Sequence, residues 1–238
     1  MPAGLALHHH ASPAACLKAE RIYALPVLLS GLGALVLSKQ EHKILYNCHM
    51  DTLVRLMKLH KRTPGCAVYF LAGTLPVTAL LHLRQLSLFG MVSRLEQNPL
   101  KTIALETLIE AKPSNKSWFQ GVRDLCVMYG LPHPIHLLEY PLSKPKFRDL
   151  CRQKVYQYWH QKLTQEANIL PSLQYLAPQF LSLSHPHPLW SSLDGNPYQT
   201  KAACIQALFL SGRYRTERLC RFWSQNLAGV CLLPACKN

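Results

Sequence analysis

Three groups of basic residues in this 238-residue chain have the spacing and the neighbours that contact with phosphates requires. Cations three, four or seven residues apart share one face of a helix, and arginines beside aromatic rings can contact both phosphates and bases. The pattern therefore predicts binding of RNA or DNA without sequence preference. The groups are Arg55, Lys58 and Arg62; Lys144, Arg148 and Arg152; and Arg213, Tyr214, Arg215, Arg218, Arg221 and Trp223.

Each group also fits a solvated helix face whose aromatic neighbours lie in the core, and spacing alone leaves both interpretations open. The charge balance favours a nucleic acid. The chain has 26 lysines and arginines against 12 acidic residues, a formal net charge of +14. A strongly basic chain of this kind is typical of proteins with an anionic partner.

The acidic residues are too few and too scattered to predict a metal-dependent active site. The four aspartates, Asp51, Asp124, Asp149 and Asp194, form no Asp-x-Asp pair, whereas two-metal phosphoryl transfer needs clustered carboxylates. Neither a glycine-rich phosphate loop nor a Gly-x-Ser-x-Gly motif is present. We therefore expect no enzyme activity, no catalytic residue and no cofactor.

The nine cysteines predict free thiols, and hence an intracellular protein in a reducing compartment, because the count is odd. Six of them fall in apolar helical stretches, where we expect small buried side chains. Cys231 and Cys236 are different, with four residues between them. A structural zinc site needs four ligands, so we expect this pair to be an incomplete metal site that stays unoccupied.

The capping and stop signals along the chain are those of a helical protein. Ser38 to Glu41 has the pattern of a capping box, and Asn98-Pro99 and Asn196-Pro197 each pair a cap with a first-turn proline. Together with the absence of strand-like alternation, they predict an all-α, multi-helical fold. We expect helices over 13–23, 39–63, 66–72, 76–89, 99–112, 117–129, 144–167 and 196–211.

The longest uncharged run, residues 22–38, lies between Arg21 and Lys39. It is shorter than the roughly 20 residues of a membrane span, and Pro26 and Gly31 interrupt it. We therefore interpret it as a buried core helix, with a single membrane span as the alternative.

Proline and charge patterns divide the chain into four segments. Residues 1–10 are expected to be disordered, residues 11–130 to form a first helical region, and residues 131–145 to be a proline-rich joint. A smaller helical region, 146–238, follows.

Several stretches from about Ala11 to Cys236 resemble the region after the polymerase palm in non-LTR (LINE-type) retrotransposon reverse transcriptases. The resemblance covers nearly the whole chain but includes no catalytic motif. It rests on Val68-Tyr69-Phe70-Leu71-Ala72-Gly73, Tyr129-Gly130-Leu131-Pro132-His133-Pro134, Leu210-Ser211-Gly212-Arg213-Tyr214-Arg215 and similar matches over 11–32, 81–90, 115–119 and 184–190.

This resemblance implies a thumb-like first helical region in a catalytically inactive fragment that retains RNA or DNA binding. The palm and its catalytic aspartates would lie before residue 1, and the missing palm is a candidate partner. Cys231 and Cys236 are similar to the first half of a terminal zinc knuckle, so zinc is expected only if the motif were completed. A helical protein-interaction scaffold, or a membrane protein anchored by 22–38, remains the alternative.

Overall fold

The computed structural model describes residues 12–95, 99–110, 117–176, 181–190 and 196–212, and these residues contain helices and no strand. The prediction of an all-α fold is confirmed. The α-helices are α1 (Pro13–Ala19), α2 (Leu25–Leu28), α3 (Lys39–Leu56), α4 (Gly65–Ala72), α5 (Val77–Ser93), α6 (Pro99–Ile109), α7 (Trp118–Tyr129), α8 (Pro134–Glu139), α9 (Lys144–Ile169) and α10 (Pro197–Leu210). Shorter turns are π-helical at Glu20–Ala24 and 3₁₀-helical at Leu32–Ala34, Pro171–Leu173 and Pro188–Trp190.

Several helix ends follow from their capping residues, as predicted. The Ser38 hydroxyl accepts from the Glu41 backbone N–H at 3.2 Å, and the Ser38 N–H donates to the Glu41 carboxylate at 2.6 Å. The Ser117 hydroxyl accepts from the Gln120 N–H and caps α7 in the same way. At the other end of α7, Gly130 has a φ of 61°, a left-handed conformation that glycine adopts without steric cost.

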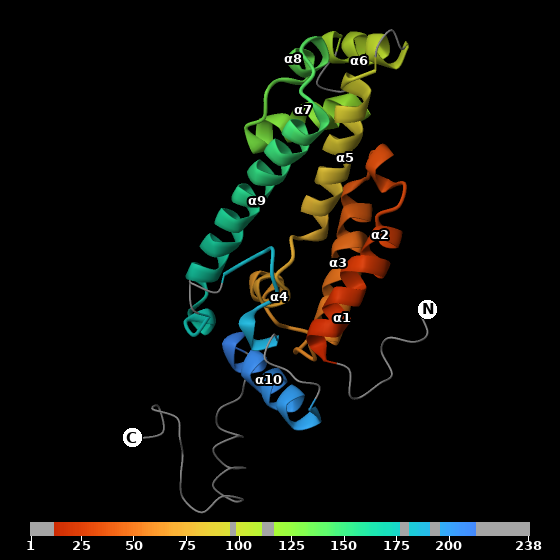
Figure 1. Ribbon diagram of the computed structural model, residues 1–238. Coiled ribbons are helices and arrows are strands. Elements are labelled where there is room, and N and C mark those ends of the chain that lie inside the picture. The colour runs from red at the N-terminus through yellow and green to blue at the C-terminus, as the bar shows by residue number, and fades with distance from the viewer. Residues whose placement is uncertain (1–11, 96–98, 111–116, 177–180, 191–195, 213–238) are drawn as a thin grey trace, which may run out of the picture.

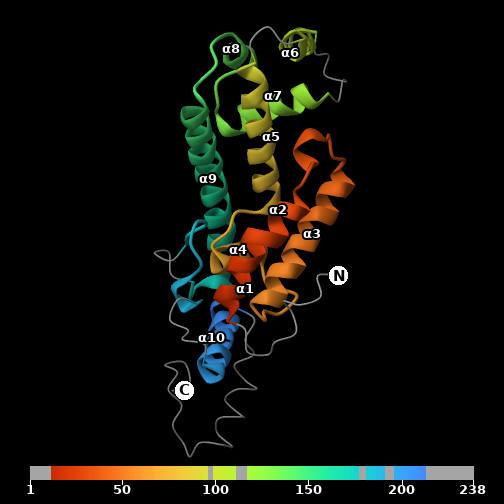
Figure 2. The ribbon, with the colours of Figure 1, turned by 45° about the vertical axis from the view of Figure 1, so that its right-hand side comes forward.

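Helices α5 and α9 run side by side along the long axis of the molecule (Figure 1). Helices α1, α2 and α3 form a layer beside them, α6, α7 and α8 gather at one end, and α4 and α10 lie toward the other. A view turned by 45° shows the same arrangement (Figure 2). The buried apolar residues fall into three clusters, one around α4, one between α5, α7 and α9, and a small one between α2, α3 and α5.

The hydroxyl of the buried Tyr129 joins three helices. It accepts from the Trp159 indole N–H of α9 at 3.0 Å and lies 2.7 Å from Nδ1 of His82 in α5. An indole N–H can only donate, so the tyrosine proton is left for His82, whose Nδ1 then accepts. Burial lowers the pKa of His82 to about 4, which agrees with a neutral imidazole in this position.

Helix α4 lies at the centre of the other cluster. Its residues from Cys66 to Ala72 are all buried. At its end, the Leu71 carbonyl accepts from the His187 N–H at 3.1 Å and from the Trp190 indole N–H at 2.9 Å. The segment 185–190 is therefore held against α4 by hydrogen bonds to a single carbonyl.

Residues 22–38 do not form the single buried helix that we predicted. The segment is divided into the end of the π-helical turn, α2 and a 3₁₀ turn. Gly31 has a φ of 73°, a left-handed conformation directly before the 3₁₀ turn Leu32–Ala34. Half of the segment's ten large apolar side chains are exposed, namely Ile22, Tyr23, Val27, Leu35 and Val36.

Among the described residues, no single helix is long and apolar enough to cross a membrane. Helices α4 and α5 meet the criteria only as a pair, and the two are bent by 65° relative to each other.

The segment expected to be a proline-rich joint, 131–145, contains helix α8. Leu137 and Leu138 of this helix are buried in the same apolar cluster as α5 and α7. Pro134 occupies the first turn of α8, where its missing N–H removes no helical hydrogen bond.

Removing the shared hydroxyl should destabilise the protein. In Tyr129→Phe the partly buried His82 Nδ1 and Trp159 N–H both lose their partner, and we expect a loss of about 1–3 kcal/mol in the free energy of unfolding. Urea denaturation measures the change. Tyr140→Phe is the control because Tyr140 is 68% exposed. Equal stabilities of the two variants would contradict this account.

Stability should also fall with acid because of His82. The pKa of a free histidine is about 6.5 and that of folded His82 is about 4, so between these values the unfolded chain binds a proton that the folded chain does not. We therefore expect unfolding to become easier by about 2 kcal/mol from pH 7 to pH 5 through this group.

The matched variant for this test is His82→Asn, whose side-chain oxygen can still accept from Tyr129. Other groups titrate in the same range, including His187, whose pKa is lowered by burial. The quantity to compare is therefore the change in the free energy of unfolding from pH 7 to pH 5, in the wild type and in the variant. The wild type should lose more stability than the variant over this interval, and parallel pH profiles would refute the assignment.

Candidate nucleic-acid interface

The first predicted basic group does not lie along one helix face, so that prediction was wrong. Helix α3 ends at Leu56, and Lys58 follows in a left-handed conformation with a φ of 55°. The chain turns here because Met57 and Leu59, on either side of Lys58, are both buried. Arg55, Lys58 and Arg62 are all exposed, but only Arg55 belongs to the helix.

The second basic group forms the row that the spacing predicts. Lys144, Arg148 and Arg152 are exposed on successive turns of α9. Arg148 pairs with Asp149 at 3.2 Å, but both side chains are more than half exposed, so this ion pair contributes little. Among the described residues, no hydrogen bond or ion pair is formed by the side chains of Lys144 or Arg152. Their charges are therefore free for a ligand.

The same row continues beyond the residues that the sequence singled out. Tyr156 and His160 follow Arg152 at two further steps of four, and their rings stack at 5.8 Å with an interplanar angle of 21°. The Tyr156 hydroxyl accepts from the Leu183 N–H at 3.3 Å, and His160 Nε2 lies 2.8 Å from the Leu181 carbonyl, to which it donates. These two side chains hold the segment 181–184 against α9.

A second row on α9 carries side-chain amides. Gln153, Gln157, Gln161 and Gln165 are exposed at intervals of four residues, and no other described residue forms a hydrogen bond with their side chains. An amide can both donate to and accept from the edge of a base. The sequence reasoning missed this row, although the spacing of the glutamines is visible in the sequence.

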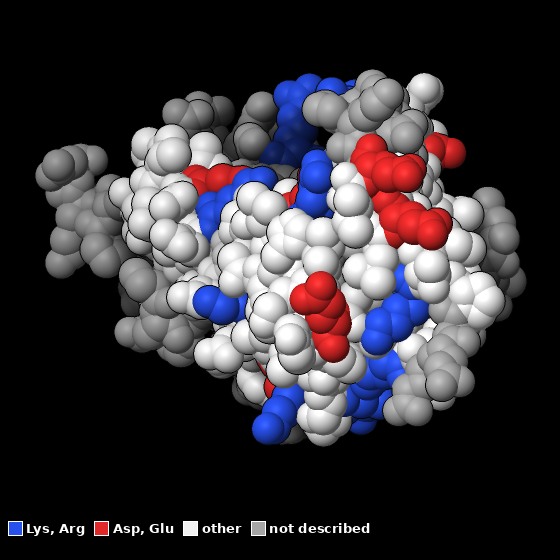
Figure 3. Space-filling view, turned by 90° about the horizontal axis from the view of Figure 1, so that it is seen from above, with Lys and Arg blue, Asp and Glu red and all other residues white. Residues whose placement is uncertain are grey.

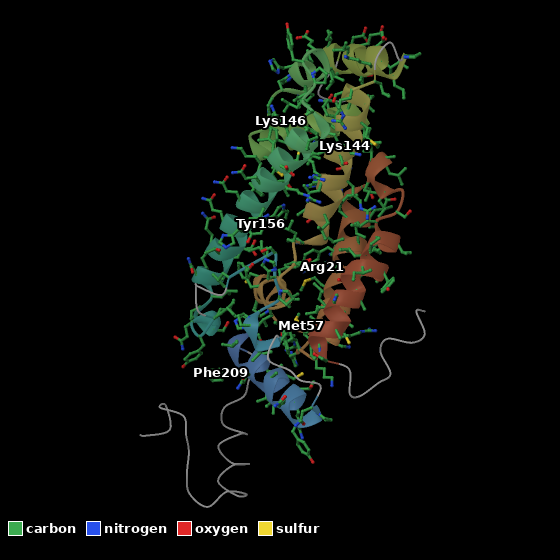
Figure 4. The ribbon with its side chains drawn as sticks, in the orientation of Figure 1. Arg21, Met57, Lys144, Lys146, Tyr156 and Phe209 are labelled. Atoms are coloured by element: carbon green, nitrogen blue, oxygen red, sulfur yellow. The ribbon has the colours of Figure 1, made fainter. Side chains whose placement is uncertain are left out.

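A cavity of about 1020 Å³ lies where the two rows meet α5 and the segment 183–184. Arg152, the three glutamines from 153 to 161, Tyr156 and His160 line it from α9, and no carboxylate is among the lining residues. Its apolar part consists of Leu75, Leu80, Leu83 and Leu183. Figure 4 shows Tyr156 between α9 and α5.

Arg21 supports the wall of this cavity from the α1–α3 layer. Its guanidinium donates to the Gly73 carbonyl at 2.8 Å and to the Ser184 carbonyl at 3.3 Å. It thus joins the end of α4 to the segment 183–184, whose residues Leu183 and Ser184 line the cavity. Figure 4 shows Arg21 in the region between α3 and α4.

Positive charge is concentrated on α9, which has six lysines and arginines and only two acidic residues, Asp149 and Glu166. The cations are not all in one row, since Lys144 and Lys146 point to different sides at the start of the helix (Figure 4). In contrast, the end of the molecule seen in Figure 3 shows acidic and basic side chains interspersed. The Arg152 side of α9 therefore has the charge that a polyanion requires.

The third basic group, Arg213 to Trp223, and the cysteines Cys231 and Cys236 lie outside the described residues. Within the part that the structure describes, no three histidine, cysteine or acidic side chains are close enough to hold a metal ion.

Five of the six described cysteines are buried and all are free, as predicted, but Cys48 is exposed, contrary to the prediction. Burial raises the pKa of Cys126 and of Cys151 to about 12, so these two thiols stay protonated and act as apolar side chains.

Comparison of the chain with known protein families, with curated proteins and with solved structures finds no match. The resemblance to LINE-type reverse transcriptases therefore rests on the sequence stretches given above.

The close packing of the cavity wall on the end of α4 should require a glycine at position 73. A Cβ at this position would lie 1.8 Å from the His185 carbonyl oxygen, whereas a Cβ at Gly130 would have nothing within 4 Å. Both glycines have a φ of 61°, so alanine at either position carries the same backbone strain of roughly 1–2 kcal/mol. Gly130→Ala is thus a matched control.

We expect Gly73→Ala to lose about 1–3 kcal/mol more stability than Gly130→Ala, because the segment 185–190 must move. Urea denaturation measures the difference, and limited proteolysis within 181–190 should become faster only in Gly73→Ala. Equal losses and equal cleavage rates would show that the segment does not pack closely on α4.

Proposed function

We propose that this protein binds single-stranded RNA or DNA along α9, without sequence preference. One observation carries the proposal: the exposed row of Lys144, Arg148 and Arg152 leads directly into a cavity that no carboxylate lines. The cations contact successive phosphates of the strand, and the glutamine row faces its bases.

The geometry favours a single strand over a duplex. Cations spaced by four residues on a helix are about 6 Å apart along its axis, so they can follow one backbone. The glutamine amides and the cavity can reach base edges only where the bases are unstacked and unpaired. In a duplex those edges face the opposite strand.

The sequence resemblance supports the origin that we propose for the chain. We infer that it is a fragment of a LINE-type reverse transcriptase polyprotein from the region after the palm. Such a fragment has no polymerase or nuclease activity of its own and no cofactor. The missing palm is its proposed protein partner. The arginine cluster Arg213, Arg215, Arg218 and Arg221, with Tyr214 and Trp223, would add contacts to the same strand.

A protein-interaction scaffold is the second candidate function. It is favoured by the exposed apolar side chains of the segment 22–36, among them Tyr23 at 68% and Val27 at 77% exposure. Tyr23→Ser with Val27→Ser separates the two functions. These changes leave nucleic-acid affinity unaltered if α9 is the binding surface, and they abolish capture of a protein partner if the segment is the functional one.

Binding should depend strongly on salt. If six cations contact phosphates, log affinity for a single-stranded oligonucleotide should fall with log salt at a slope of roughly −4. Fluorescence anisotropy at several salt concentrations gives the slope for wild type and for two triple variants that remove the same charge. In the first, Lys144, Arg148 and Arg152 are changed to Gln, and in the second Arg55, Lys58 and Arg62 are changed to Gln.

The α9 variant should bind more weakly than the second variant. The magnitude of its salt slope should be about 2 below that of the wild type. Equal losses in the two variants would mean that total charge, and not the α9 surface, determines binding. A wild-type slope near zero would show that these cations are solvated helix faces only.

A further inference from the structure

The cavity beside α9 combines three kinds of surface. Leu75, Leu80 and Leu83 give it an apolar floor, the glutamine amides form a polar rim, and Arg152 provides a positive charge. Its volume of about 1020 Å³ is at the upper end of the range for small-molecule sites.

The wall of the cavity that the segment 183–184 forms is held by hydrogen bonds within the chain. Tyr156 and His160 hold the segment 181–184 from α9, and Arg21 holds Ser184 from the α1–α3 layer. Because these hydrogen bonds fix the wall, the loss of conformational entropy on binding a ligand is small.

We propose that this cavity holds one unstacked base of the bound strand together with its phosphate, and this inference rests on the function proposed above. A base has a flat, largely apolar face, which the leucine floor covers. Its edge presents donors and acceptors, which Gln153, Gln157 and Gln161 can match because each amide both donates and accepts. The adjacent phosphate pairs with Arg152.

Other ligand classes use only part of these features. A free phosphate would leave the apolar floor exposed, and an uncharged apolar ligand would leave the Arg152 guanidinium unpaired. A metal ion or an organic cation would need carboxylates, of which the lining has none. An anionic ligand with a flat, partly apolar body satisfies all three surfaces, and a nucleotide of a single strand is such a ligand.

The experiment compares two single-stranded oligonucleotides of equal length and phosphate count, one with bases and one in which every nucleotide is abasic. Fluorescence anisotropy at fixed salt gives both affinities. The wild type should bind the oligonucleotide with bases roughly tenfold more tightly, because the abasic strand has neither an apolar face to cover the leucines nor a base edge to pair with the glutamine amides. The abasic strand should keep its salt-dependent binding to the cations.

The test variant changes Gln153, Gln157 and Gln161 together to Ala, and the matched control is Gln165→Ala. All four glutamines are exposed on the same helix, where alanine is a good helix former, but Gln165 does not line the cavity. The triple variant should bind the two oligonucleotides with affinities within about threefold of each other, and Gln165→Ala should retain the wild-type preference.

Each other outcome overturns a stated part of the account. If the wild type binds both strands equally, the base-binding cavity is wrong and the proposed backbone binding stands. If the preference for bases survives in the triple variant, a base is held elsewhere on the chain. If neither strand binds to the wild type, the proposed function itself fails, and the base-binding cavity fails with it.

Discussion

The hydrogen bond from Trp159 to the Tyr129 hydroxyl and the buried apolar side chains of α9 together fix the rotation of α9 about its own axis. The hydroxyl joins Trp159 of α9 to His82 of α5, and Trp159 can reach it only when one particular side of α9 faces α5 and α7. In that rotation Cys151 and Val155 are buried in the same cluster. Tyr156 and His160, which follow Val155 and Trp159 of this cluster by one position each, then meet the segment 181–184.

The glutamine row is exposed as a result of the same rotation. A turn of α9 by two residues, about 200°, would bury the amides and expose the core side chains. The segment 181–190 depends in turn on α4, because the Leu71 carbonyl accepts from two of its N–H groups. The candidate interface is therefore assembled from three elements, α9, α5 and this segment. The apolar cluster around α4 supports the segment, and the cluster between α5, α7 and α9 supports the two helices.

The sequence predicted those parts of the molecule that depend on local chemistry. The capping box at Ser38 and the cap at Asn196 before Pro197 are set by neighbouring residues, so they could be recognised directly. The end of α3 could not, because it depends on the burial of Met57 and Leu59 in the cluster around α4. The charge-free run 22–38 shows no clear period, so its hydropathy did not reveal that half of its large apolar side chains are exposed. Likewise, the basic row on α9 was predicted from spacing, whereas the cavity depends on the distant segment 183–184.

Photo-crosslinking tests the central claim, that nucleic acid lies along the Arg152 side of α9, most directly. A single-stranded oligonucleotide that carries photoreactive bases is irradiated with the full chain at low salt, and the crosslinked peptides are identified by mass spectrometry. The account predicts that crosslinks occur within 148–161 and on the segment 183–184, and that free oligonucleotide without the photoreactive group competes them away. Crosslinks found only in other parts of the chain, such as 55–62, would contradict it.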